Sequence, residues 1–250
     1  MGKSSAFGTV LGMGTGLVQV ETATVVGTIS GSGNATVTIT AANLVGSPLA
    51  VSVAVLNLDS ASVAAGKMRD ALALTAAVTA LFDVTGATDK IILTRKGPFA
   101  NDATLNIATA NGSCTGLTAA PTSANTNAGE TLTSVAYIKN ISGPGLALDS
   151  EDVTTHDSTN AWEEVVATVL RTGELSLDIV YDPQGATHNA STGLIYFSKS
   201  KITVGFRVTF PGAVAWDFAA VVAGFEPSAP HDGALTAAVK LKITGAPILA

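Results

Sequence analysis

The run Trp216-Asp-Phe-Ala-Ala-Val-Val-Ala-Gly-Phe-Glu-Pro-Ser-Ala-Pro230 and its continuation Leu235-Thr-Ala-Ala-Val-Lys-Leu-Lys-Ile-Thr-Gly-Ala-Pro247 decide the fold of this chain. Both are rich in the β-branched and aromatic residues that favour strands. In the second run, apolar Val239, Leu241 and Ile243 alternate with lysines, so they share one face of a strand. The prolines between the runs interrupt strand hydrogen bonding. We therefore predict two strands joined by a Pro-rich corner.

Further strands are predicted upstream of this pair. Glu174–Tyr181 alternates cleanly between apolar and polar residues, and so does Lys201–Phe210. Ser134–Ile141 is a third candidate strand, and His188–Phe197 is a candidate short helix. Together these elements predict a mainly β fold (α+β), a β-sandwich or half-barrel with a flanking helix.

The stretch from residue 22 to residue 129 differs in composition, being rich in Thr, Ala, Asn and Gly and poor in charge. We predict a hairpin from Ala35–Thr40 and Leu49–Leu56, and an amphipathic helix within Asp59–Leu74 that is capped by Asp59 or Ser60. Three more strands follow, at Phe82–Thr85, Lys90–Thr94 and Thr104–Ala108. Thr122–Gly129 has the composition of a linker. The expected domains are therefore 1–20 with 130–250, and an inserted small α+β domain at 21–129.

Bulk properties exclude several classes of function. A net charge of −6 disfavours a nucleic-acid binder, because phosphate contacts need Lys and Arg. The single Cys114 excludes an intrachain disulfide, and the glycines of the N-terminus argue against a secretory signal. His156, His188 and His231 are far apart in sequence and are predicted to be polar loop residues. We expect no enzyme, no cofactor, no metal site and no membrane insertion.

Three further segments carry a family resemblance. They are Ile138–Gly145 followed by Val153–Ser158, then Gly173–Pro183, and then the C-terminal run, of which Gly224–Pro230 is the most distinctive part. In order and spacing they resemble the major tail tube proteins of siphophages, whose fold is shared with type VI secretion tubes. Residues 21–129 resemble a module inserted in some members of that family.

The resemblance implies a structural virion protein in a long flexible phage tail. Its subunits would assemble in the host bacterial cytoplasm into stacked hexameric rings, the conduit for DNA ejection. The implied partners are other copies of the chain, tail terminator and tail-tip proteins, and a tape measure protein inside the lumen. DNA would pass without specific binding. An Ig-like surface adhesin or capsid decoration protein is the alternative that the strand pattern leaves open.

Two sets of residues are expected to act in assembly. Ser142–Thr159 is long for a hairpin loop, and long ordered loops are commonly functional. The predicted contacts to the neighbouring subunit or ring are Ser142, Gly143, Pro144, Gly145, Asp149, Glu151, Asp152, Thr154, His156 and Asp157. The polar face of the strand at Glu174–Tyr181 is expected to line the lumen, through Glu174, Ser176 and Asp178.

Overall fold

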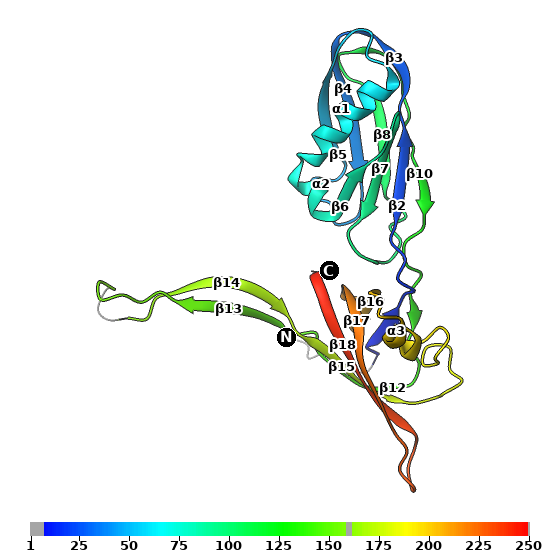
Figure 1. Cartoon of the computed structure of the whole chain (residues 1–250), viewed down its shortest axis with the longest axis vertical. Helices are drawn as coiled ribbons and strands as arrows, with labels where there is room; N and C mark the ends of the chain where they lie inside the picture. The colour runs from blue at the N-terminus through cyan, green and yellow to red at the C-terminus, as the bar shows by residue number, and fades with distance from the viewer. Residues whose placement is uncertain (1–7, 159–161, 250) are drawn as a thin grey trace. The chain divides into compact units, whose positions relative to one another are not determined.

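The computed structural model describes residues 8–158 and 162–249. The chain divides into two compact units, each with its own hydrophobic core (Figure 1). The terminal unit combines Met1–Thr15 with Leu132–Ala250, and the inserted unit is Gly16–Thr131.

The terminal unit is built on a curled half-barrel sheet of seven strands, in which all neighbours are antiparallel. The strands, in spatial order, are β11 (Thr133–Ser134), β1 (Val10–Met13), β16 (Val204–Thr209), β17 (Ala215–Ser228), β18 (Thr236–Leu249), β15 (Glu174–Val180) and β12 (Ile138–Ser142). This mainly β architecture confirms the predicted fold class.

The predicted C-terminal strand pair is the centre of this sheet. β17 and β18 run antiparallel from Ser228↔Thr236 at the corner to Trp216↔Leu249 at the far end. Val239, Leu241 and Ile243 are buried, as their alternation predicted. The register shifts twice along the pair, and such bulges increase the local twist of a sheet. The shifts therefore favour curling of this long hairpin.

The core of the terminal unit lies on one face of the sheet. Leu175, Leu177 and Ile179 of β15 are buried there, whereas the residues between them are exposed, which confirms the predicted alternation. Helix α3 (Leu194–Ser200) packs Leu194 and Phe197 into the same cluster.

The helix predicted at His188–Phe197 therefore begins six residues too early. The side-chain oxygen of Asn189 accepts hydrogen bonds from the backbone N–H groups of Ser191 and Thr192, at 2.9 Å and 2.8 Å. This local bonding holds a turn in place of a helix. Lys201, with φ 56°, ends the helix in the left-handed region.

His188 lies in a turn, in agreement with its prediction as a loop residue, but its side chain is fully buried. Its Nδ1 accepts the backbone N–H of Asp182 at 3.2 Å, so the ring proton lies on Nε2. Nε2 then donates to the carbonyl of Ala136 at 3.0 Å. The ring links two backbone segments that are far apart in sequence and has a structural role here.

The inserted unit contains a four-stranded sheet, a three-stranded sheet, a strand pair and two helices. The four-stranded sheet is, in order, β10 (Ala124–Asn127), β2 (Val20–Thr24), β7 (Lys90–Arg95) and β6 (Phe82–Thr85). The three-stranded sheet is β5 (Leu49–Val55), β4 (Gly33–Thr40) and β8 (Asn106–Asn111). The remaining elements are the strand pair β3 (Val26–Gly31) and β9 (Thr115–Thr118), and helices α1 (Ala61–Ala73) and α2 (Ala76–Leu81).

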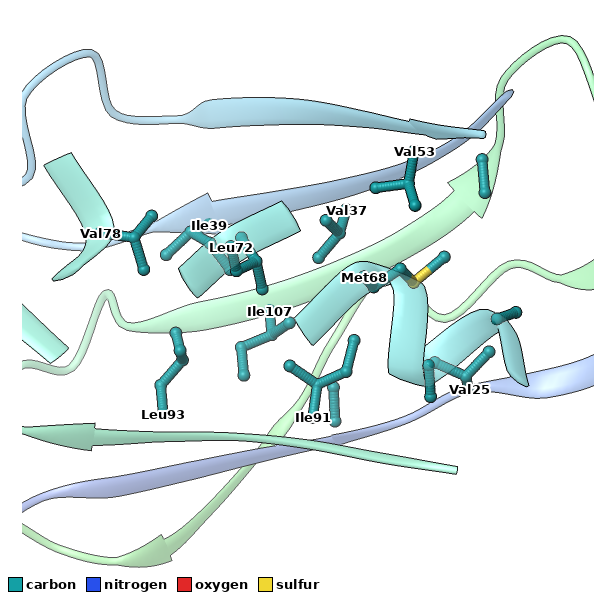
Figure 2. Packing of buried hydrophobic residues seen from close by; sticks show 14 of the residues in the cluster. Val25, Val37, Ile39, Val53, Met68, Leu72, Val78, Ile91, Leu93 and Ile107 are labelled. Carbon is teal, nitrogen blue, oxygen red and sulfur yellow. The ribbon is translucent and has the colours of Figure 1, made fainter. Parts of the chain in front are cut away.

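Helix α1 fills the space between these strands. Figure 2 shows Met68 and Leu72 of α1 among Val37, Val53 and Ile107 of the three-stranded sheet. The predicted cap is confirmed, because the Oγ of Ser60 accepts the N–H of Val63 at 3.3 Å. Val63 itself is exposed, and the buried face of the helix is Ala64, Ala65, Met68 and Leu72.

Strand predictions in the inserted unit were right where the pattern was apolar. The hairpin of β4 and β5 and the pair of β6 and β7 are both present. The strand predicted at Thr104–Ala108 is β8, which lies two to three residues later. The prediction that Thr122–Gly129 is a linker was wrong, because this segment contains β10, which pairs with β2. Polar side chains support that pairing, as in the 2.7 Å hydrogen bond from Asn127 Nδ2 to the carbonyl of Val18.

Candidate subunit interface

The terminal unit carries a second hairpin, which extends away from its sheet (Figure 1). It consists of β13 (Leu146–Asp152) and β14 (Val165–Thr172), paired antiparallel with Leu148 opposite Leu170. We call residues 146–172 the arm. The arm replaces a prediction that was wrong, the long loop at 142–159. Thr159, the last residue of the predicted loop, lies outside the described residues.

A glycine-rich joint connects the arm to the sheet. β12 leads into β13 through Gly143-Pro-Gly145, and β14 leads into β15 through Gly173 alone. The N–H of Gly173 donates to the carbonyl of Gly145 at 2.8 Å. Gly143 has φ 92°, and a Cβ there would lie 2.5 Å from the carbonyl oxygen of Glu174. Only glycine fits this close backbone approach.

The arm is apolar and yet exposed. Leu148 and Leu170 face each other across the strands, at 59% and 65% exposed. The other large apolar side chains exposed along it are Leu146, Val153, Trp162, Val165, Val166 and Val169. Among the described residues, none of these belongs to either hydrophobic cluster. A two-stranded hairpin is only marginally stable alone in water, and exposed apolar patches of this kind are typical of interaction surfaces.

Charged groups line β13 and the loop beyond it. The guanidinium of Arg171 forms an ion pair with Asp149, across the register shift of the hairpin. The carboxylate of Asp152 accepts hydrogen bonds from Thr154, which hold the pKa of that carboxyl below its usual range. His156 and Asp157 are exposed in the loop.

The ten residues predicted as contacts lie along the arm and at its junction with the sheet. Asp149, Glu151, Asp152, Thr154, His156 and Asp157 lie on the arm. Gly143, Pro144 and Gly145 belong to its joint with the sheet, and Ser142 is the last residue of β12. Sequence reasoning missed the apolar residues of β14. The run of β-branched residues from Val165 to Val169 was the signal that could have identified them.

The exposed face of the curled sheet carries charges of both signs. Glu174, Ser176 and Asp178 all lie on it. The register places Lys242 opposite Glu174, and Lys240 opposite Ser176. These lysines are exposed, so this part of the sheet is mixed in charge rather than uniformly acidic.

An ion pair lies further along the same sheet. Arg207 on β16 is opposite Asp217 on β17, and it donates from both Nε and Nη2, at 2.6 Å and 2.7 Å. This forked contact raises the pKa of Arg207, since Asp217 stabilises its charged form.

Other kinds of site find little support in the described part of the chain. Residues 8–158 and 162–249 contain no cluster of three or more His, Cys, Asp or Glu side chains arranged to hold a metal ion. Within the same residues, no helix is long and apolar enough to cross a membrane. Cys114 is buried.

The terminal unit thus combines a curled sheet with an exposed apolar arm. The chain belongs to the lambda phage tail tube protein family, whose family model matches residues 118–250. It is therefore a structural tail protein of a virion, and the resemblance noted in the sequence is confirmed. A comparison with curated proteins gave no match.

Three solved structures are similar to part of the chain. A chain of the virion of a native gene transfer agent particle is 15% identical, with a TM-score of 0.40 over 48% of this chain and 88% of that one. A chain of the tail of an empty gene transfer agent particle with C6 symmetry is also 15% identical. Its TM-score is 0.40, over 48% of this chain and 86% of that one. A chain of the baseplate of the anti-feeding prophage is 13% identical, with a TM-score of 0.36 over 48% of this chain and 84% of that one.

Proposed function

We propose that this protein is the repeating subunit of a phage tail tube, in which stacked hexameric rings form the conduit for DNA ejection. The uncovered arm is the observation that carries the proposal. A hairpin with exposed leucines and valines on a virion protein is stabilised when a neighbouring subunit removes that surface from water.

The sheet edges support the same proposal. β12 ends the seven-stranded sheet on one side and the two-residue β11 ends it on the other. Unpaired edges favour association, and a ring of subunits that joins them into a closed barrel removes them. In such a ring the arm reaches the next subunit or the next ring through the ten residues named above and the apolar residues of β14.

The exposed face of the sheet is the proposed lumen lining, through Glu174, Ser176 and Asp178 with Lys240 and Lys242 beside them. A face that carries charges of both signs offers DNA little net attraction, which suits passage without specific binding. The residues that span the inserted unit, 21–129 in our domain proposal, decorate the tube exterior. The remaining partners are tail terminator, tail-tip and tape measure proteins, and assembly takes place in the host cytoplasm.

Electron microscopy of the purified chain over a range of concentrations tests the proposal. We expect hollow six-fold rings or tubes. The double variant Leu148→Asp and Leu170→Asp places charge on the arm and abolishes them, while the circular dichroism spectrum is kept. Val45→Asp is the matched control, because Val45 is 79% exposed in the inserted unit and outside the arm. Compact particles without a central channel would refute the ring, and tubes from the double variant would refute the role of the arm.

A further inference from the structure

Strand β5 leaves one edge of its sheet open. It is the border strand of the order β5–β4–β8 and pairs with β4 from Gly33↔Val55 to Ile39↔Leu49. Within the described residues, no strand pairs with its other side. Seven residues of backbone therefore end the sheet here.

Hydrogen bonds around β4 show which groups of β5 face the open side. The carbonyl of Asn34 accepts the N–H of Gly112 at 2.9 Å, so even-numbered residues of β4 direct their backbone toward β8. The N–H of Thr109 donates away from β4, to Ala120 at 2.8 Å, which fits the same pattern. Because the backbone direction alternates along a strand, odd-numbered residues of β4 bond to β5. Val51 and Val53 complete those bonds.

Three residues of β5 alternate with the bonded positions Leu49, Val51, Val53 and Val55, and these three face outward. Ala50, Ser52 and Ala54 therefore present one N–H and one C=O each to the open edge. This set of groups has defined ends. Pro48 has no N–H to offer, and the N–H of Leu56 already donates to the carboxylate of Asp59 at 2.7 Å.

The open edge lacks the protection that edge strands commonly carry. Leu49-Ala-Val-Ser-Val-Ala-Val55 contains no charge, no proline and no glycine. It also reads almost identically in both directions about Ser52, with Ala50 matching Ala54 and Val51 matching Val53. Pro48 and Leu56, which end the open edge, are equally distant from Ser52. A strand with this symmetry is complementary to an antiparallel copy of itself.

We propose that β5 pairs antiparallel with β5 of a second copy of this chain, about a twofold axis at Ser52. Ser52 then faces Ser52 of the second copy, and Ala50 faces its Ala54. Each outward N–H meets an outward C=O, because residues directly opposite in such a pair exchange both hydrogen bonds. The two three-stranded sheets become one continuous six-stranded sheet.

The side chains allow this approach. Ala50, Ser52 and Ala54 are small and exposed, and they share a face with Thr36 and Thr38 of β4. Strands in a sheet lie about 4.8 Å apart, a spacing that these side chains do not obstruct. The register also brings Pro48 of one copy opposite Leu56 of the other. Leu56 is 62% exposed in the single chain, and the pairing gives it an apolar neighbour.

The pairing goes beyond the proposed tube and does not depend on it. A tube of stacked rings is polar, and a twofold contact cannot relate two subunits of one polar tube. The β5 contact therefore joins free subunits before assembly, or subunits of two separate tubes.

Cysteine cross-linking in the full chain tests the register. Opposite α-carbons of a bonded pair lie about 5.5 Å apart, within disulfide reach. Under mild oxidation Ser52→Cys should yield a covalent dimer. Ala50→Cys alone should not, because the two copies of that position are about 14 Å apart along the strands. Mixing Ala50→Cys with Ala54→Cys should restore the dimer. The unaltered chain, whose only cysteine is the buried Cys114, is the control.

Sedimentation velocity provides the second measurement. Ser52→Pro removes an outward N–H and keeps the bonds to β4, so it should shift the dimer to monomer. Ser52→Thr keeps the N–H and should stay dimeric. No dimer from Ser52→Cys, equal cross-linking of Ala50→Cys, or a dimeric Ser52→Pro would each overturn the pairing. Loss of tubes from arm variants leaves all these results unchanged, so the two proposals fail separately.

Discussion

Replacing Glu21 by glutamine should stabilise the inserted unit. Glu21 lies on β2 with its side chain in the core, only 2% exposed. Ser123 Oγ donates to Oε1, whereas the buried Oε2 has no hydrogen-bond partner in the structure. A buried carboxylate with one unsatisfied oxygen opposes folding. Glutamine keeps the shape and the acceptor for Ser123 but carries no charge.

The sign of this effect follows from the pKa. Burial is the largest cause that raises the pKa of Glu21 above 4.5; the hydrogen bond from Ser123 opposes it, and the charge of Asp102 adds to it. A raised pKa means that the folded state disfavours the charged form. The destabilisation is therefore absent below about pH 4.5, grows as the pH rises toward the folded-state pKa, and is complete above it.

The size of the effect is about 1 kcal/mol at pH 7. Both side chains leave one buried polar group unsatisfied, so they differ by the cost of burying the charge. We take this cost at the lower end of about 1–3 kcal/mol, because the hydrogen bond from Ser123 stabilises the carboxylate. Native-state hydrogen exchange in the full-length protein measures the gain in stability of the inserted unit. We expect the amides of β7 and α1 to exchange about fivefold more slowly in Glu21→Gln. Tryptophan fluorescence is unsuitable, because Trp162 and Trp216 both lie in the terminal unit.

Asp70→Asn is the matched control, since Asp70 is exposed on α1 and loses the same charge. It should leave exchange almost unchanged. Faster exchange in Glu21→Gln, or a gain equally large at pH 4 and pH 7, would refute the reasoning. The first result would show that the carboxylate stabilises the fold, and the second that its charge is irrelevant.

Three other predictions follow from packing and backbone geometry. Met68→Ala removes a fully buried side chain of α1 and should destabilise the inserted unit by about 2–5 kcal/mol, seen as lost hydrogen-exchange protection. Gly143→Ala should abolish tubes in electron micrographs, because its Cβ would meet the Glu174 carbonyl, whereas Gly145→Ala has open space and should assemble normally. Arg207→Lys loses the forked contact to Asp217. It should lower the free energy of unfolding by about 1 kcal/mol, measured by denaturation followed by circular dichroism.

Elements with strong local patterns could be predicted from the sequence. Alternation located β15 and the C-terminal strand pair, and the cap at Ser60 located the start of α1. In each case the determining interactions lie within a few residues, or the hydrophobic period is long enough to specify the buried face. The family also followed from the C-terminal segments.

Elements held by distant partners could not be predicted. β10 is made of polar residues, and only its pairing with β2 makes it a strand. His188 looked like a loop residue, and its burial depends on the backbone groups of Ala136 and Asp182. The same holds for β13, whose acidic residues indicated a loop. It is a strand because it pairs with β14.

The sequence by itself determined the fold class, the C-terminal hairpin, the capped helix and the family, because local periodicity and turn residues encode them. Only the tertiary structure decided two features. The proposed interface is an apolar arm on a glycine-rich joint, and β5 is a border strand whose unpaired edge is centred on Ser52. Both features depend on which strands remain unpaired. Pairing is set by contacts between residues far apart in the chain, and no local pattern records an absent neighbour.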